Sequence, residues 1–344
     1  MRRATRILVA LPAGALMFAG CAQPAEQSIE EEAGLGAGAV REQLSIVTGG
    51  TTGVYFQVGG VLANTITDGV EGQSGSAETT GASVENLRLL GSGEADIAIA
   101  QGDAVSEAFE GRNDFEGRAV QSYALAVLYP NVFHAVSLEG NAVELGLECF
   151  SDIVDTRYSV GAVGSGNEAT TTNVFSALEI STSDIEIQQL GYADTDSALR
   201  NDQLDAGSWV VGEGHAGLSE LATTEDVHLI PMCDEEVSVI TAATNSYTEH
   251  TIPGGTYPGV EGDVQTIAVW NLMVVSGDFN EQQAYDITSA MFDNIDDFVA
   301  AYAPGEEYMV PETILNSPVP VHPGAARFYE EQGVELPEDL LAQS

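Results

Sequence analysis

Short apolar runs alternate with amphipathic stretches between residues 44 and 300, and this alternation predicts an α/β fold. The apolar run at 44–47 leads into TGGTTGVYFQVGG at 48–60, a glycine-rich turn after which apolar residues recur at helical spacing. The stretch YSVGAVGSGNEATTTNVFSALEI at 158–180 repeats the order of strand, glycine turn and helix. The last third of the chain has no glycine-turn motif of its own, so we expect it to return to the first unit.

These units predict two α/β lobes. Lobe I comprises residues 43–133 together with 237–344, and lobe II comprises residues 134–236. The chain has 344 residues, which is long enough to give each lobe its own core. Two passages between lobes make a hinge, and a hinge above a central cleft is typical of proteins that close around a ligand.

The first twenty residues have the pattern of an export signal. Three arginines precede the apolar run ILVALPAGALMFA at 7–19, which is too short to span a membrane. The run ends in FAGC, which is similar to a lipobox and predicts a lipoprotein signal peptide at 1–20, with lipid on the sulfur of Cys21; Phe18 stands where leucine is usual. The acidic, glycine- and alanine-rich segment 21–42 is interpreted as a flexible tether.

The charge balance is strongly acidic. The chain has 53 Asp and Glu against 10 basic residues, all of them Arg, and a formal net charge of −43. Such a charge excludes nucleic acid and anionic membrane surfaces as partners, because both are polyanions. An acidic surface over an ordinary core suits a halophilic source, since at 1 M salt the Debye length is only about 3 Å. Without Lys there is no P-loop lysine and no Schiff base.

Both glycine turns precede a predicted helix, whose free N–H groups and positive dipole end favour a carboxylate or a phosphate. Ser165 has an additional interpretation, because the pattern S-x-x-E at 165–168 also predicts a helix cap. Tyr55 follows the first turn directly and is expected to form a pocket wall. Gln101 and Asp103 follow the strand 95–100 at its carboxyl end, where α/β sheets bind ligands; for Asp103 a solvated loop is the alternative.

Nothing in the sequence assembles into a catalytic set. The motifs H-E-x-x-H, C-x-x-C and G-x-S-x-G are absent, and the five His are scattered. We therefore expect no enzyme, no metal site and no cofactor. Cys149 and Cys233 either form a disulfide in an oxidising compartment or stay as two buried free thiols.

Four stretches resemble the TAXI-type solute receptors of TRAP transporters. They are LSIVTGGTTGVYFQVGGVLANTI, TTGASVENLRLLGSGEADIAIAQGDA, VGAVGSGNEATTTNVFSAL and IPGGTYPG, in order within residues 43–300. The resemblance implies a two-lobe fold like that of type II periplasmic binding proteins. It also implies capture of a small organic anion, a dicarboxylate or an amino acid such as glutamate, for a TRAP-type membrane permease. The protein would be a periplasmic or cell-surface monomer, in contact with the membrane only through the lipid on Cys21.

The same resemblance places a set of residues in the cleft: Thr51, Thr52, Gly53, Tyr55, Thr80, Ser83, Gln101, Ser165 and Gly166. One departure from the family pattern is Trp209, in DAGSWVVGEGHA at 205–216, which we expect to reshape the pocket. The alternative is an exported binding protein that serves an ABC permease or a sensor. An exported hydrolase is disfavoured, because the sequence lacks a nucleophile motif and a metal set.

Overall fold

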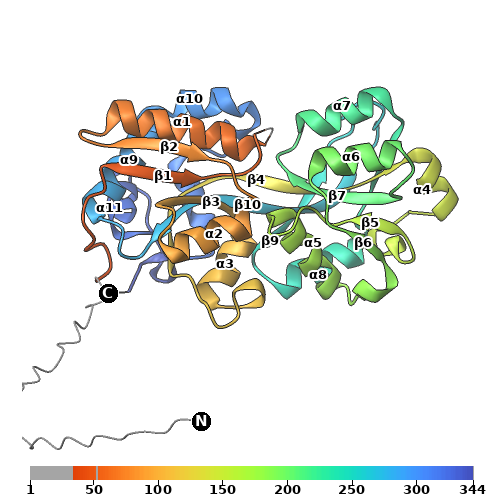
Figure 1. Ribbon diagram of the computed structural model, residues 1–344, viewed down its shortest axis with the longest axis horizontal. Coiled ribbons are helices and arrows are strands. Elements are labelled where there is room, and N and C mark those ends of the chain that lie inside the picture. The colour runs from red at the N-terminus through yellow and green to blue at the C-terminus, as the bar shows by residue number, and fades with distance from the viewer. Residues whose placement is uncertain (1–33, 52, 344) are drawn as a thin grey trace, which may run out of the picture. The chain divides into compact units, whose positions relative to one another are not determined.

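The computed structural model describes residues 34–51 and 53–343, which form a mixed α/β structure (Figure 1). The expected signal peptide, Cys21 and Thr52 lie outside the described residues. The strands are β1 (Gln43–Val47), β2 (Ser74–Glu78), β3 (Ile97–Gln101), β4 (Ser122–Leu138), β5 (Arg157–Ser159), β6 (Glu186–Gln188), β7 (Ala206–Val211), β8 (Val227–Ile230), β9 (Tyr247–Ile252) and β10 (Val264–Ser276). The helices are α1 (Val54–Gly69), α2 (Ser83–Ser92), α3 (Gly102–Glu110), α4 (Glu139–Leu145), α5 (Gly166–Ala177), α6 (Tyr192–Arg200), α7 (Ala216–Thr224), α8 (Asp234–Ala243), α9 (Glu281–Asp293), α10 (Ile295–Ala301) and α11 (Pro323–Glu331).

The strands join into one ten-stranded sheet in the order β2-β1-β3-β10-β4-β7-β5-β6, with β8 beside β4 and β9 beside β10. At one end β1 runs parallel to β2 and β3, and at the other end β5 runs parallel to β6 and β7. The two parallel groups are connected by β4 and β10, which pair with each other in antiparallel fashion. This arrangement confirms the α/β fold predicted from the alternating pattern.

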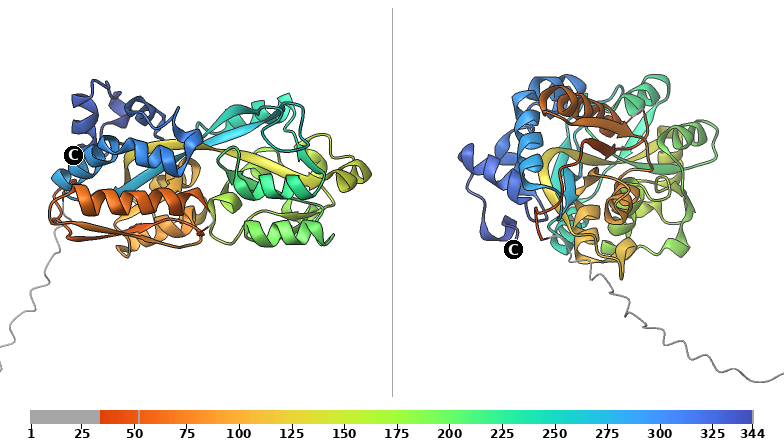
Figure 2. Two further views of the ribbon diagram at one scale, coloured as in Figure 1. Left: turned by 90° about the horizontal axis from the view of Figure 1, so that it is seen from above. Right: turned by 60° about the vertical axis from the view of Figure 1, so that its left-hand side comes forward.

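The long strands β4 and β10 belong to both halves of the sheet. Strand β10 pairs with β9 over 264–269 and with β3 over 271–275. Strand β4 pairs with β7 only over 132–137. Figures 1 and 2 show β4 in yellow and β10 in blue, running side by side from one half to the other. They are the two passages that the sequence predicted between lobes.

Pro130 interrupts the apolar segment 121–138 and so predicts two strands with a break between them, but this expectation is wrong. A single strand, β4, continues through Pro130, which lies opposite Trp270 of β10. The proline is tolerated because β7 pairs with β4 only from Val132 onward and because the β10–β4 register shifts between Trp270 and Leu272.

The hydrophobic cores divide near residue 130 and near residue 270. The core of the first lobe draws on residues between 44 and 129 and between 272 and 340, together with Ala169 of α5. Two further clusters, on opposite sides of β7, draw on residues between 132 and 269. The sequence division assigned residues from 237 onward to lobe I, but Val237, Ile240, Tyr247 and Ile267 pack in the second core. They do so because β9 pairs with the half of β10 that lies in that lobe.

Only part of the expected tether lies in the described residues, and that part is attached to the first lobe. The backbone N–H groups of Gly36 and Gly38 donate to the carbonyl groups of Gly277 and Asp278. Arg41 forms an ion pair with Asp96, at 2.8 Å. Among residues 34–51 and 53–343, no helix combines the length and the apolar character that crossing a bilayer requires.

Candidate functional site

A cavity of about 320 Å³ lies between the two lobes. The first lobe supplies the N-terminal ends of α1 and α2, the end of β3 and the middle of β4. The second lobe supplies the N-terminal ends of α5 and α6 and the connection from β7 to α7. The N-terminal ends of these four helices therefore meet around one space, and Gln101 and His215, the N-cap residues of α3 and α7, line it too.

Three of these four helices begin without a side-chain cap. The N-cap residues are Gly53 for α1, Ala82 for α2 and Gly191 for α6, and no side chain accepts a hydrogen bond at these positions. At α5, Ser165 Oγ accepts from the N–H of Glu168 at 3.1 Å, so the predicted cap is present. First-turn N–H groups that no side chain occupies remain available to an anion.

The cavity wall carries little side-chain charge. Of the described residues that line it, none is Arg, and Asp194 is the only one with a carboxylate. Valine, alanine and tyrosine side chains form much of the rest, among them Val54, Val210 and Tyr192. An anion held here would be bound by backbone N–H groups and neutral side chains, and its carbon skeleton would meet an apolar surface.

Gln101 joins the two lobes at the floor of the cavity. Its backbone N–H donates to Ser83 Oγ at 3.1 Å, and its Nε2 donates to Thr170 Oγ1 of α5 at 2.7 Å. Its Oε1 accepts from Asn131 Nδ2 of β4 at 3.3 Å. The side chain of Gln101 is only 3% exposed and forms hydrogen bonds with residues of both lobes, so it fixes the spacing of the lobes at this point.

An alanine at residue 166 would force the side chains of Ser83 and Gln101 to move. A Cβ atom on Gly166 would lie 2.5 Å from Ser83 Oγ and 2.6 Å from Gln101 Oε1. The second glycine turn thus lies in close contact with side chains of the first lobe.

The structure brings together most of the residues expected in the cleft. The lining includes Gly53, Tyr55, Thr80, Gln101, Ser165 and Gly166. Thr51 is exposed and does not line the cavity, and Ser83 lies behind the wall, bonded to Gln101. Thr52 lies outside the described residues.

Trp209 does not line the cavity, contrary to the expectation that it reshapes the pocket. It is 2% exposed and packs in the cluster on the α6 and α7 side of β7. The ring of Tyr192, which does line the cavity, is stacked on it with centroids 6.2 Å apart. Trp209 therefore supports the wall from behind. Asp103, for which a solvated loop was the alternative interpretation, is buried in α3.

Several lining residues were not expected, and three of them carry buried atoms that find no hydrogen-bond partner among the described residues. These atoms are the Tyr129 hydroxyl, Asn167 Oδ1 and His215 Nδ1. Burial raises the pKa of Tyr129 well above its usual range and lowers the pKa of His215, so it favours the neutral form of both side chains. Unpaired polar atoms on a cavity wall are available to a bound molecule.

No local signal in the sequence identifies Tyr129 and Asn131, which face the cavity because β4 crosses between the lobes. The sequence GEGH at 212–215 favours a loop or a helix start for His215. It is the N-cap residue of α7, and it also lines the cavity.

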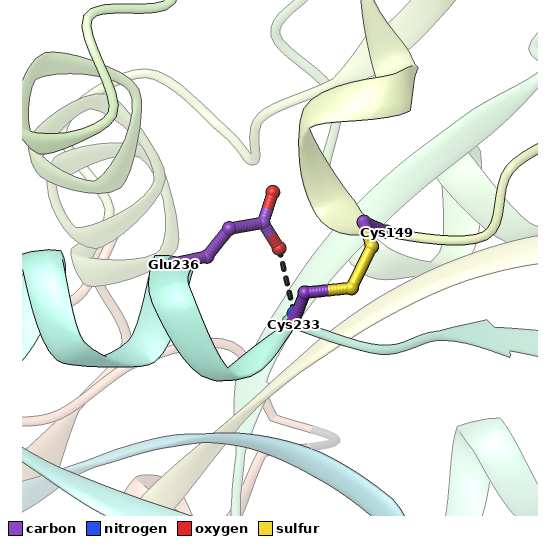
Figure 3. Close-up of side chains that lie close together, drawn as sticks. All are labelled: Cys149, Cys233 and Glu236. Carbon is purple, nitrogen blue, oxygen red and sulfur yellow. Dashed lines mark hydrogen bonds between the residues drawn. A yellow bond between two sulfur atoms is a disulfide. The ribbon is translucent and has the colours of Figure 1, made fainter.

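Outside the cavity, Cys149 and Cys233 form a disulfide, with their Cα atoms 5.5 Å apart (Figure 3). The carboxylate of Glu236 lies beside them and accepts from the N–H groups of Cys233 and Ser151, at 2.8 and 2.7 Å. Because the sulfur atoms bond to each other and Glu236 binds backbone N–H groups, this cluster ties η2 (Phe150–Ile153) to α8.

The fold is similar to that of solved structures at low sequence identity. A protein from Bordetella bronchiseptica RB50 matches with a TM-score of 0.52 and 17% identity, over 88% of this chain and 86% of that chain. The periplasmic aliphatic sulphonate binding protein SsuA from Escherichia coli matches with a TM-score of 0.46 and 13% identity, over 88% of this chain and 96% of that chain. PhnD1 from Prochlorococcus marinus in complex with methylphosphonate has a TM-score of 0.49 and 10% identity, over 76% of this chain and 89% of that chain.

A comparison with protein families extends over both lobes. The match runs from residue 46 to residue 333 and so includes the glycine turns, both crossing strands and the cavity. The chain belongs to the NMT1-like family.

Proposed function

We propose that this protein is an extracytoplasmic solute-binding protein that captures a small organic anion between its lobes and delivers it to a membrane permease. The observation that carries the proposal is the interlobe cavity, where helix N-termini from both lobes meet the Tyr129 hydroxyl, which has no hydrogen-bond partner among the described residues. Backbone N–H groups at helix ends stabilise an anion without any need for Arg or Lys.

The chemistry of the wall favours an organic anion over an inorganic one. An inorganic ion would leave the valine, alanine and tyrosine surfaces facing water, whereas a carbon skeleton would cover them. A dicarboxylate or an amino acid such as glutamate, as the sequence resemblance implies, has suitable dimensions and charge. Under this proposal the chain binds and releases its ligand unchanged.

The recipient that we propose first is an ABC permease. The match to the NMT1-like family, over residues 46–333, favours this alternative over the TRAP-type permease. The TRAP hypothesis is still supported by the four stretches that resemble TAXI receptors. The neighbouring gene would distinguish the two permease types, because an ATPase gene indicates an ABC permease and a gene for a large multi-span permease indicates a TRAP system.

The remaining expectations belong to the same proposal. The protein acts as a monomer in the periplasm or at the cell surface, anchored through lipid on Cys21. The hydrophobic clusters support a division in which the second lobe extends from about residue 132 to about residue 269.

A thermal-shift screen tests the proposal. Carboxylates, amino acids, sulphonates and phosphonates are added one at a time to the protein in concentrated KCl, because a ligand that binds only the folded state raises the melting temperature. We expect at least one organic anion to stabilise the wild type and to lose that effect in Tyr129→Phe. Equal stabilisation of Tyr129→Phe by every hit would contradict the site assignment.

A further inference from the structure

Helix α5 of the second lobe is docked against α3 of the first lobe, below the cavity. Ala169 of α5 packs in the core of the first lobe. Thr170 donates a hydrogen bond from Oγ1 to Asp103, and Asn173 Nδ2 donates to Glu107 Oε1 at 2.6 Å. Two acidic side chains of α3 therefore form the contact between the lobes.

Both carboxyl groups are buried at this contact. Asp103 is 2% exposed and Glu107 is 5% exposed. They lie four residues apart on the same helix face, so their charges repel each other at short range. A buried pair of like charges is costly unless one of the two is neutral.

The hydrogen bonds assign the charge to Asp103. Its carboxylate accepts from Thr170, from the Tyr247 hydroxyl at 2.8 Å and from the N–H of Ala104 at 2.8 Å. Glu107 accepts only from Asn173 among the hydrogen bonds of the described residues. Three donors stabilise the ionised form of Asp103, so the proton of the pair belongs on Glu107.

The charged groups around Glu107 do not neutralise it. A second cavity of about 500 Å³ opens beside it and is lined by Arg88, Asp114 and Glu168 as well. Arg88 pairs with Asp114 at 2.9 Å, and Arg112, which follows α3, pairs with Glu110. The cations near Glu107 are thus already paired with other carboxylates.

The pKa of Glu107 reflects this environment. Burial and the charge of Asp103 raise it to about 7, against the smaller opposite effects of Asn173, Asn113 and Arg112. Burial also raises the pKa of Asp103. The donors from Asn173 and Tyr247 belong to elements of the second lobe, so separation of the lobes would hydrate both carboxyl groups.

We propose that closure of the lobes traps one proton on Glu107, so that the closed form of the cleft is favoured as the pH falls through neutrality. The pair is connected to the ligand cavity, since Gln101 Nε2 donates to Thr170 Oγ1 and Thr170 donates to Asp103. The inference rests on the proposed function only in requiring that the lobes open and close.

The sign follows from linkage. Glu107 binds its proton more tightly in the closed form, because burial there disfavours the charged carboxylate. The closed form therefore gains free energy below the pKa of Glu107 in the closed form. As the pH rises, this stabilisation is lost, and the ratio of closed to open molecules falls by at most about tenfold per pH unit. A charged Glu107 would favour hydration and opening.

The experiment measures the distance between the lobes in the mature, solute-free protein. Dyes on exposed residues of α1 and α7, introduced through non-canonical amino acids so that the cysteines stay intact, report closure by single-molecule energy transfer. The pH is varied between about 5 and about 9 in constant concentrated KCl. We expect the closed population of the wild type to fall with rising pH, and Glu107→Gln to stay closed throughout.

Glu168→Gln is the matched control, because Glu168 lines the same cavity and forms no ion pair with an Arg among the described residues, so the loss of its negative charge releases no cation beside Glu107. Its pH dependence should equal that of the wild type. A wild type without pH dependence, or a Glu107→Gln variant with the pH dependence of the wild type, would overturn the proposal.

Carboxyl ¹³C titration gives a second, independent test that remains valid if Glu107→Gln does not fold. Gly166→Ala holds the lobes apart, so Glu107 should titrate at a lower pH in that variant than in the wild type. Identical midpoints would reject the linkage. Neither measurement uses a solute, so a failure to find any bound anion is distinguishable from a failure of this inference.

Discussion

The hydroxyl group of Tyr55 donates a hydrogen bond to Oδ1 of Asn271, which joins a wall of the cavity to the strand that both lobes share. Asn271 is fully buried, and its Nδ2 donates to the carbonyl group of Tyr129 at 2.9 Å. Two tyrosines on the cavity wall are thus positioned from β10. A shift of β10 would therefore move two tyrosines of the cavity wall.

Replacement of Tyr55 with Ala should weaken ligand binding while the protein stays folded. The variant removes a wall of the cavity, and we expect a loss of about 1–3 kcal/mol, or roughly tenfold to a hundredfold in affinity. Titration calorimetry with the best anion from the screen measures it. Tyr55→Phe is the control, since it keeps the ring and should bind nearly normally while it loses about 1–3 kcal/mol of stability through the unpaired Asn271 oxygen. Unchanged affinity in folded Tyr55→Ala would reject Tyr55 as a pocket wall.

Replacement of Gly166 with Ala should reduce affinity by at least about tenfold, because a clash of this kind costs about 1–3 kcal/mol. The added Cβ would meet Ser83 and Gln101 of the opposite lobe and keep the lobes from closing. Gly60→Ala is matched to it, since Gly60 is also helical and a Cβ there has no atom within 4 Å. The prediction fails if the two variants bind the same anion equally well.

Loss of the disulfide between Cys149 and Cys233 should destabilise the protein without changing its ligand affinity. The bond joins residues that are 84 positions apart in the sequence. A cross-link over such a distance raises the free energy of the unfolded state by about 4 kcal/mol, because it restricts the unfolded chain. Denaturant unfolding of the double variant Cys149→Ser/Cys233→Ser measures the loss. Added reductant should lower the unfolding free energy of the wild type and leave that of the variant unchanged. Equal stability of the two proteins under oxidising conditions would show that the bond contributes nothing.

The acidic composition predicts folding that depends on salt. With a formal net charge of −43, self-repulsion of the folded chain is strong in dilute buffer and is screened in concentrated KCl. The melting temperature should therefore rise steeply between low and multimolar KCl. A melting temperature that is the same at both concentrations would reject the halophilic reading.

Helices, caps and turns depend on residues that are close together in the sequence, and these parts of the structure could be predicted from it. The apolar spacing after the first glycine turn predicted α1, and the repeated order of strand, glycine turn and helix predicted α5. The pattern at 165–168 predicted the cap that Ser165 forms. The same turns predicted most of the cavity residues that the sequence identified correctly, because a glycine turn before a helix places N–H groups at the end of a strand.

Other parts depend on long-range pairing, which a local pattern does not contain. Tyr129 and Asn131 reach the cavity only because β4 pairs with both β10 and β7 on its way between the lobes. Trp209 lies in a strand that is buried on both faces, so the sequence did not indicate which face it would take. Residues 237–269 join the second lobe through the pairing of β9 with β10.

The most direct measurement is native mass spectrometry of the purified mature protein in volatile salt, followed by identification of the small molecule that denaturation releases. The account predicts one organic anion per protein, recovered intact and displaced when Gly166 is replaced with Ala. A released molecule that is a reaction product, or a protein that takes up no organic anion from the panel, would contradict it.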